Sequence, residues 1–147
     1  EVHKRQVQTR DNVAQAVEAD HQTEIIESSR KAQRNSVADG IVAAAREIAE
    51  TANIAAICCF SQRGTTALLV ARERPRVPIL ALTNEINTAR RLCLTWGTNC
   101  VMSGPVDRFK DAVIAAVRAA KAENMATEDD MIVITAGVPF NTPGSTN

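Results

Sequence analysis

Short apolar runs alternate with longer segments of helical spacing along most of this chain. The runs are Ile54–Phe60, Pro78–Thr83, Cys100–Met102 and Met131–Thr135. Unbroken apolar runs of this length, bounded by turn residues, are typical of strands covered on both faces. We therefore predict four buried strands.

The segments between the runs have apolar residues three and four positions apart, which predicts helices. The first helix follows a pattern like a capping box at Ser36 and Asp39 and extends to about Thr51. Its predicted apolar face consists of Val37, Ile41, Ala44, Ala45 and Ile48. The second follows Ser61–Thr66 and has to end before Pro75.

Two more helices are predicted between the later strands. One carries Ala89, Leu92, Cys93 and Trp96 and stops at Gly97. The other begins at Pro105, and its predicted apolar face consists of Val106, Phe109, Val113, Val117 and Ala120. Strands that alternate with helices in this way predict an α/β fold with a mostly parallel sheet and helices on both faces.

Residues 1–35 are more polar than the rest. Val13 and Val17 lie one helical turn apart, and Ile25 with Ile26 start a second short apolar patch. We predict one or two amphipathic helices that need a partner surface, because so polar a segment is not stable alone.

Composition excludes several classes of function. The chain has 17 Lys and Arg against 17 Asp and Glu, so bulk charge favours neither nucleic acid nor acidic lipid. No apolar run approaches the length of a membrane span. The cysteines, Cys58, Cys59, Cys93 and Cys100, have no metal-binding spacing, which favours buried reduced thiols and a cytoplasmic location.

The candidate chemistry lies in the loop after the first strand. The loop Ser61–Thr66 offers three hydroxyls, an arginine, a glycine and a helix N-terminus behind it. Free N–H groups and the helix dipole favour anions at such a position. Because similar strings are common at strand-to-helix turns, composition alone favours an ordinary capped turn over an anion site, and the charge of Arg63 shifts the balance slightly toward the anion.

Other candidate sites are weak. His3 and His21 lie in the polar N-terminal segment, and neither a Walker-type nor a GxGxxG motif occurs. We interpret the acidic run Glu128–Asp130 as a solvated turn. We interpret Arg72, Arg74 and Arg76 as a solvated helix end and turn. We predict no catalytic and no metal-binding residue in this chain.

Several motifs together resemble one enzyme family. The stretch FSQRGTTALLVARERPRVPILALT resembles the strand, phosphate loop, helix and Arg-Pro-Arg turn of the pyruvate kinase C-terminal domain. TARRLCLTWGTNCV is similar to that domain's next helix and strand, and DDMIVITAGVPFNTPGSTN to its last parallel strand and effector-side loop. VEADHQTEIIESSRKAQ resembles the segment that links the domain to the catalytic barrel.

The resemblance implies a three-layer α/β/α domain over 36–147, preceded by a helical linker at 1–35. The family's sheet has five strands, the last antiparallel, and this sequence ends where that strand would follow. With Glu1 rather than Met at its start, we expect a piece of a longer polypeptide. The intact enzyme would transfer a phosphoryl group between phosphoenolpyruvate and ADP in glycolysis with Mg²⁺ and K⁺, using residues of the barrel and none of this chain.

The resemblance also implies a regulatory site for a phosphorylated sugar or nucleotide, and homo-oligomers. The residues that match the effector phosphate loop are Ser61, Gln62, Arg63, Gly64, Thr65 and Thr66, with Gly144 and Ser145 in a closing loop. Arg63 stands where many family members have a small residue, and 138–143 differs from loops that bind a sugar bisphosphate. The alternatives are a purely structural subunit-assembly domain and a small stand-alone protein that binds or acts on a phosphometabolite.

Overall fold

The computed structural model describes residues 2–18 and 36–137. The chain divides into two units, Glu1–Arg34 and Asn35–Asn147. In the first, α1 (Val2–Glu18) is a helix with no buried residue, and Val13 and Val17 are exposed. This confirms one of the predicted N-terminal helices, whereas Ile25 and Ile26 lie outside the described residues.

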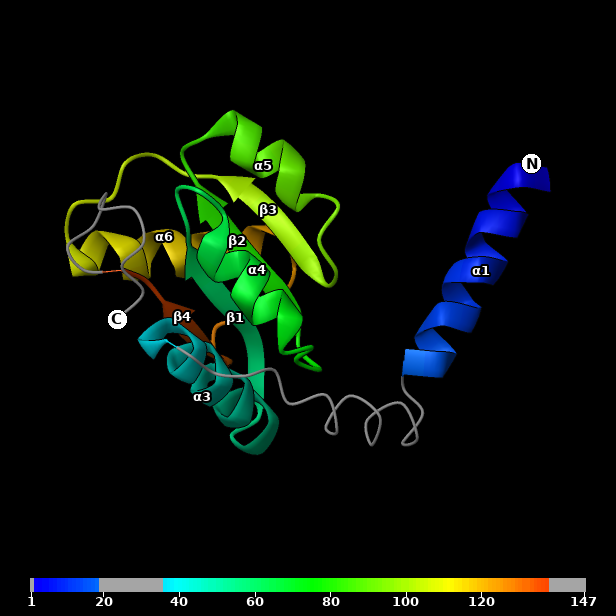
Figure 1. Ribbon diagram of the computed structural model, residues 1–147, viewed down its shortest axis with the longest axis horizontal. Helices are drawn as coiled ribbons and strands as arrows, with labels where there is room; N and C mark the ends of the chain where they lie inside the picture. Colours follow the sequence, from blue (N-terminus) through cyan, green and yellow to red (C-terminus); the bar gives the residue numbers. More distant parts are fainter. Residues whose placement is uncertain (1, 19–35, 138–147) are drawn as a thin grey trace. The chain divides into compact units, whose positions relative to one another are not determined.

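The second unit contains a four-stranded sheet that is parallel throughout. Its strands are β1 (Ile54–Phe60), β2 (Ile79–Thr83), β3 (Thr98–Met102) and β4 (Met131–Thr135). Their order is β3-β2-β1-β4, so β1 and β2 are central (Figure 1). All four predicted strands are confirmed, but the edge strands β3 and β4 are only partly buried, whereas the prediction had all four buried. The antiparallel fifth strand implied by the resemblance is not among the described residues.

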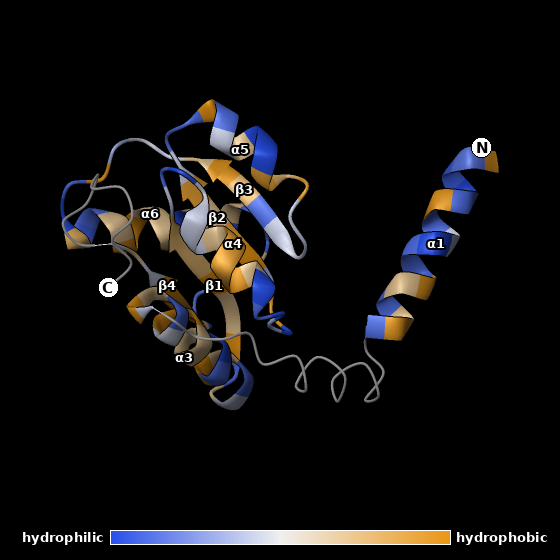
Figure 2. Ribbon diagram, viewed as in Figure 1, coloured by the Kyte–Doolittle hydropathy of each residue, from blue (hydrophilic) through white to orange (hydrophobic). Residues whose placement is uncertain are grey.

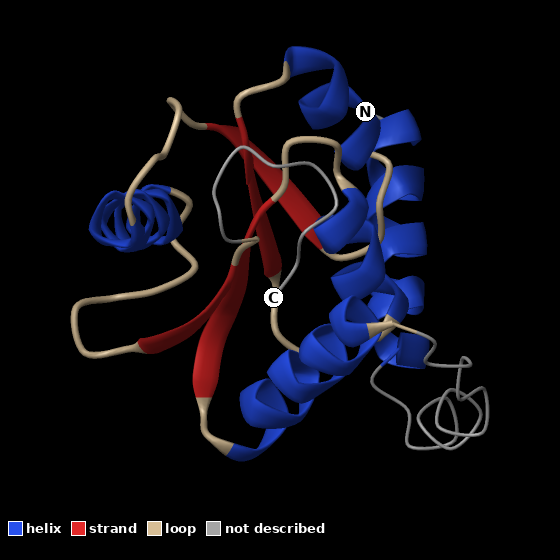
Figure 3. Cartoon of the chain, turned by 60° about the vertical axis from the view of Figure 1, so that its left-hand side comes forward, coloured by secondary structure: helices blue, strands red, loops and turns tan. Residues whose placement is uncertain are grey.

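Helices cover both faces of the sheet and form a three-layer α/β/α domain, as predicted (Figure 3). On one face lie α3 (Val37–Thr51), α4 (Thr65–Arg72) and α5 (Ile86–Leu92), and on the other lies α6 (Phe109–Ala122). The sheet and the inner helix faces form the apolar centre seen in Figure 2. The first core contains Ile57, Cys59, Val70, Ile79 and Leu92, and the second contains Cys58, Leu80, Leu82 and Ala116.

The predicted helix faces were partly wrong. Val37 and Ile48 of α3 are 74% and 47% exposed, and Phe109 of α6 is 70% exposed. The buried positions are instead rich in alanine: Ala43, Ala45 and Ala49 in α3, and Ala112, Ala116, Ala119 and Ala120 in α6. Alanine faces let a helix approach the sheet closely, so the larger side chains are turned away from it.

Two helix ends also differ from the prediction. The last helix begins after Arg108 rather than at Pro105, and α5 ends at Leu92 before the predicted Trp96. The guanidinium carbon Cζ of Arg74 lies over the Trp96 ring, 4.5 Å from the centroid of that ring. Trp96 therefore packs against the turn after α4 and is not part of the helix.

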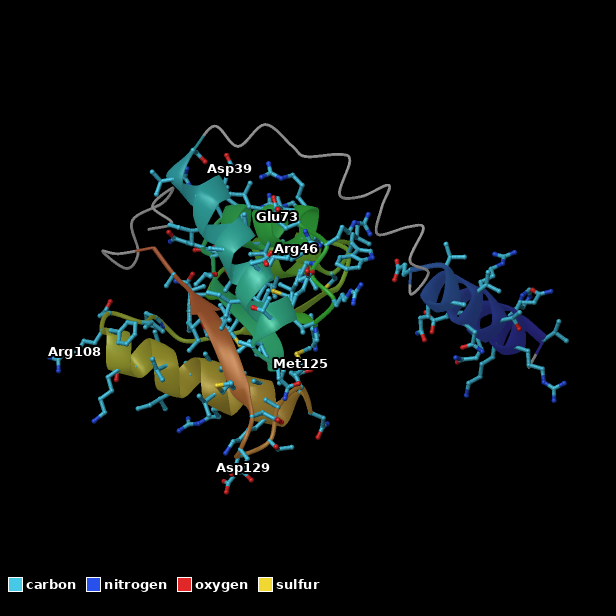
Figure 4. The ribbon with its side chains drawn as sticks, turned by 90° about the horizontal axis from the view of Figure 1, so that it is seen from below. Asp39, Arg46, Glu73, Arg108, Met125 and Asp129 are labelled. Carbon is cyan, nitrogen blue, oxygen red and sulfur yellow. The ribbon has the colours of Figure 1, made fainter. Side chains whose placement is uncertain are left out.

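An ion pair joins the two helices on the α3–α4 face. The capping box is confirmed: Ser36 N–H and Oγ donate to Asp39 Oδ2 at 3.0 and 2.7 Å, and Asp39 N–H donates to Ser36 Oγ at 3.2 Å. The other Asp39 oxygen accepts from Arg72 Nη2 at 2.5 Å. This hydrogen bond raises the pKa of Arg72 above its ordinary value, so the guanidinium stays charged. Asp39, labelled in Figure 4, thus binds the end of α4 to the start of α3.

The four cysteines differ in exposure. Cys58 and Cys59 are fully buried in the two opposite cores, Cys100 is half-buried, and Cys93 is exposed, which corrects the prediction that all are buried. Burial raises the pKa of Cys58 to about 12 and also raises that of Cys59.

We expect one fast-reacting thiol in the native protein. At pH 8 a thiol-disulfide reagent should modify Cys93 within seconds, because only a thiolate in contact with solvent attacks it. Cys58 and Cys59 should react only after unfolding in urea. Peptide mapping of the modified chain checks this, and rapid native modification of Cys58 or Cys59 would contradict the packing described.

Candidate functional site

The candidate site lies at the carboxyl edge of the sheet, beside the point where the strand order reverses. From β1 the chain runs to β2 and β3 on one side and later places β4 on the other side of β1. In open α/β sheets, ligands bind beyond the carboxyl ends of the strands at such a switch point. The Ser61–Thr66 loop leaves β1 here, and Thr135 ends β4 here.

The start of the loop is held by hydrogen bonds. Ser61 N–H donates to Leu82 O at 3.0 Å, which extends the pairing of β1 with β2. Ser61 Oγ accepts from Thr66 N–H at 3.2 Å. Both residues are buried, so Ser61 acts as a side-chain cap for α4, as the capped-turn interpretation predicts.

The middle of the loop offers backbone donors. Within the described part of the chain, the N–H groups of Gln62, Arg63, Gly64 and Thr65 donate to no protein acceptor. They precede or open α4, whose N-terminal end carries the positive end of the helix dipole. A row of free N–H groups at a helix N-terminus is the arrangement that holds phosphate in other folds.

Gly64 is required for this conformation. Its φ is +83°, in the left-handed region that side chains other than glycine rarely adopt. A Cβ here would lie 3.3 Å from both Leu92 Cδ2 and Thr88 Cγ2. Two residues of α5 therefore pack against the loop at Gly64.

Arg91 of α5 also reaches the loop, which the sequence did not predict. Its Nη2 donates to the carbonyl oxygen of Arg63 at 2.5 Å and lies 3.5 Å from the Cβ position of Gly64. Helical spacing alone does not decide which of Arg90 and Arg91 turns toward β1. Within the described ranges, neither Arg63 nor Arg91 forms an ion pair with a carboxylate.

Among the residues that the structure describes, two buried oxygens near this edge have no hydrogen-bond partner. They are Oε1 of Gln62, in the loop, and Oγ1 of Thr135, a residue that is 6% exposed. Thr135 pairs with Cys59 in the neighbouring strand. Ser61 comes two residues after Cys59, so it lies on the same face of the sheet as Cys59 and Thr135. Buried polar atoms are rarely left unpaired, so both oxygens point to a missing partner.

The structure thus brings together the predicted residues Ser61, Gln62, Arg63, Gly64, Thr65 and Thr66. Arg63 and Thr65 are exposed, while Ser61 and Thr66 are buried beneath them. Gly144 and Ser145 lie outside the described residues. The signal that could have found Thr135 was present, since a hydroxyl at the end of a buried strand lies at the binding edge of a parallel sheet.

The other candidates stay solvated or structural. Asp130 accepts from Thr127 N–H and Oγ1 at 2.7 and 2.8 Å, and these bonds lower its pKa. The acidic run is therefore a hydrogen-bonded turn. In the described ranges no group of His, Cys, Asp and Glu could hold a metal ion, and no helix is long and apolar enough to cross a membrane.

Known proteins have sequences similar to this one. The family described as "Pyruvate kinase, alpha/beta domain" matches residues 39–147. The chain belongs to this family. A pyruvate kinase of Methylorubrum extorquens is 34% identical over 140 residues, and one of Agrobacterium vitis is 37% identical over 123 residues. These alignments cover 95% and 84% of this chain, but 29% and 26% of the relatives.

Solved structures of the family have the same fold. A Cryptosporidium parvum pyruvate kinase in complex with ADP superposes with a TM-score of 0.71 at 26% identity, covering 80% of this chain and 24% of that protein. The chain thus spans about a quarter of the length of the pyruvate kinases that it matches. The similarity covers both the sheet and the Ser61–Thr66 loop of this pyruvate kinase domain.

Proposed function

We propose that this chain is the regulatory domain of a pyruvate kinase and binds a phosphorylated effector at Ser61–Thr66. The single observation that carries the proposal is the row of four free N–H groups at the start of α4. The unpaired oxygens of Gln62 and Thr135 favour a ligand that also donates hydrogen bonds. A sugar phosphate or a nucleotide has both a phosphate group and hydroxyl donors.

In the intact enzyme, we propose, a barrel domain of the same polypeptide carries the chemistry. It would transfer a phosphoryl group between phosphoenolpyruvate and ADP with Mg²⁺ and K⁺, in the cytoplasm. The present chain would supply no catalytic residue. An effector that orders the loop would change packing between domains or subunits and so alter the distant active site.

Titration with phosphates tests the effector site. We expect inorganic phosphate, a sugar monophosphate or a nucleoside monophosphate to shift the amide NMR signals of residues 62–65, because these N–H groups have no protein acceptor. Sodium chloride at the same ionic strength is the control for screening. The absence of both amide shifts and calorimetric heat with all three phosphates would contradict the proposal.

A second function, subunit assembly without an effector, is favoured by exposed apolar side chains on the α3–α4 face. Val37, Ile48 and Leu68 are 74%, 47% and 46% exposed. Sedimentation equilibrium tests this: we expect a homo-oligomer that Ile48→Glu dissociates. A monomer at all concentrations would contradict assembly through this chain alone.

A further inference from the structure

The two arginines at the loop differ in what their side chains do. Both residues are exposed, but among the described residues the side chain of Arg63 has no hydrogen bond or ion pair that holds it, and only its carbonyl group is held. Arg91 extends from α5 to the loop and donates one of its five N–H groups to that carbonyl oxygen. The remaining donors of Arg91 have no carboxylate partner within the described part of the chain.

The position of Arg91 places its charge beside Arg63 and Gly64, two of the residues that carry the free N–H groups. Nη2 lies 3.5 Å from the Cβ position of Gly64, the residue immediately before α4. Arg91 is also fixed to its own helix next to Leu92, which is fully buried in the core. The guanidinium is therefore held from two sides, by the carbonyl of Arg63 and by a helix anchored on the sheet.

A pre-positioned guanidinium changes which anion the loop prefers. The N–H groups and the helix end together carry only a partial charge, roughly half an elementary charge. A guanidinium adds a full positive charge and a fork of donors that matches phosphate oxygens. The attraction grows with ligand charge, so a doubly charged group gains more from Arg91 than a singly charged group of the same shape.

We propose that Arg91 is a specificity-determining residue of the loop, and that it selects doubly charged phosphate groups over singly charged anions. This inference rests on the proposed function, since it concerns the ligand of the same site. It is supported independently of the helix end by the buried, unpaired hydroxyl of Thr135 at this edge of the sheet. Arg90, its neighbour, has no bond to the loop and does not take part.

The test compares methyl phosphate with methyl sulfate at pH 8, because both have the same shape and only the phosphate is doubly charged. Affinities come from the amide shifts of residues 62–65 in the 147-residue chain. In Arg91→Gln we expect methyl phosphate to bind about tenfold more weakly, the loss of one charge-assisted hydrogen bond, with little change for methyl sulfate. Arg91→Lys should restore part of the affinity, since it keeps the charge and loses the fork.

Arg90→Gln is the matched control, because it removes the same charge one residue away. We expect less than a twofold change for either anion. Equal losses in Arg90→Gln and Arg91→Gln would overturn the inference and leave the effector site in place, as would an unchanged ratio of the two anions in Arg91→Gln. The absence of any methyl phosphate binding by the unaltered chain would overturn both the site and the inference. Urea unfolding of each variant distinguishes a lost ligand contact from a lost fold.

Discussion

Replacing Gly64 by alanine should lower the free energy of unfolding by about 3 kcal/mol, the sum of left-handed backbone strain and overpacking. The strain arises because φ is +83° at this residue. The overpacking arises because the new Cβ would lie 3.3 Å from Leu92 Cδ2 and Thr88 Cγ2. Leu92 is fully buried and cannot move aside easily.

Two other glycines allow the cost of backbone strain to be measured apart from the cost of overpacking. Gly97 has a φ of +61° but nothing within 4 Å of its Cβ position, so Gly97→Ala should cost only the strain, about 1 kcal/mol. Gly40 lies inside α3 with free space around it, so Gly40→Ala should stabilise the protein by up to about 1 kcal/mol. Urea unfolding followed by circular dichroism measures all three. Equal losses at Gly64 and Gly97 would mean that α5 yields to the added methyl group.

Replacing Asp39 by asparagine should cost about 2–3 kcal/mol, because it removes the charge of a mostly buried carboxylate and leaves Arg72, among the described residues, with only the more distant carboxylate of Glu73, 3.6 Å away. The Asp39 side chain is 10% exposed and that of Arg72 is 39% exposed, so solvent screens the pair only in part and the upper range for a buried pair does not apply. The loss should change little with salt.

Glu50→Gln is the matched control for Asp39→Asn. Glu50 Oε1 accepts from Arg46 Nε at 2.8 Å within one helix, with side chains 29% and 20% exposed for Arg46 and Glu50. Such i,i+4 pairs contribute less than about 0.5 kcal/mol. Ser36→Ala, which removes only the cap, should cost about 1 kcal/mol. A loss at Asp39 no larger than that at Ser36 would show that the bond to Arg72 adds no stability.

The strands could be predicted from the sequence because each contains a run of apolar residues, although β3 begins with the polar Thr98 and Asn99, which the prediction left out. Burial on both faces leaves a pattern that needs no knowledge of the partners, as β2 illustrates with all five of its residues buried. The helix faces could not be predicted in the same way. In α3 and α6 alanine occurs on several sides, and only the packing decides whether Val37 or Ala43 faces the sheet.

The candidate site was also predictable from the sequence only in part. The loop Ser61–Thr66 is contiguous, so its composition and its place after a strand pointed to it directly. Arg91 and Thr135 come from α5 and β4, and only the strand order brings them to the same edge. Asp39 was expected as a cap, but its second role depends on Arg72, 33 residues away.

The strand order has a consequence for synthesis. On a ribosome α3 emerges before the central β1, and α4, β2, α5 and β3 follow, so one face of the sheet can be covered while the chain is still growing. The opposite face, with Cys58, Leu80 and Leu82, waits for α6, and the β1 edge waits for β4. A nascent chain stalled before Phe109 would therefore expose an apolar sheet face that a chaperone can bind.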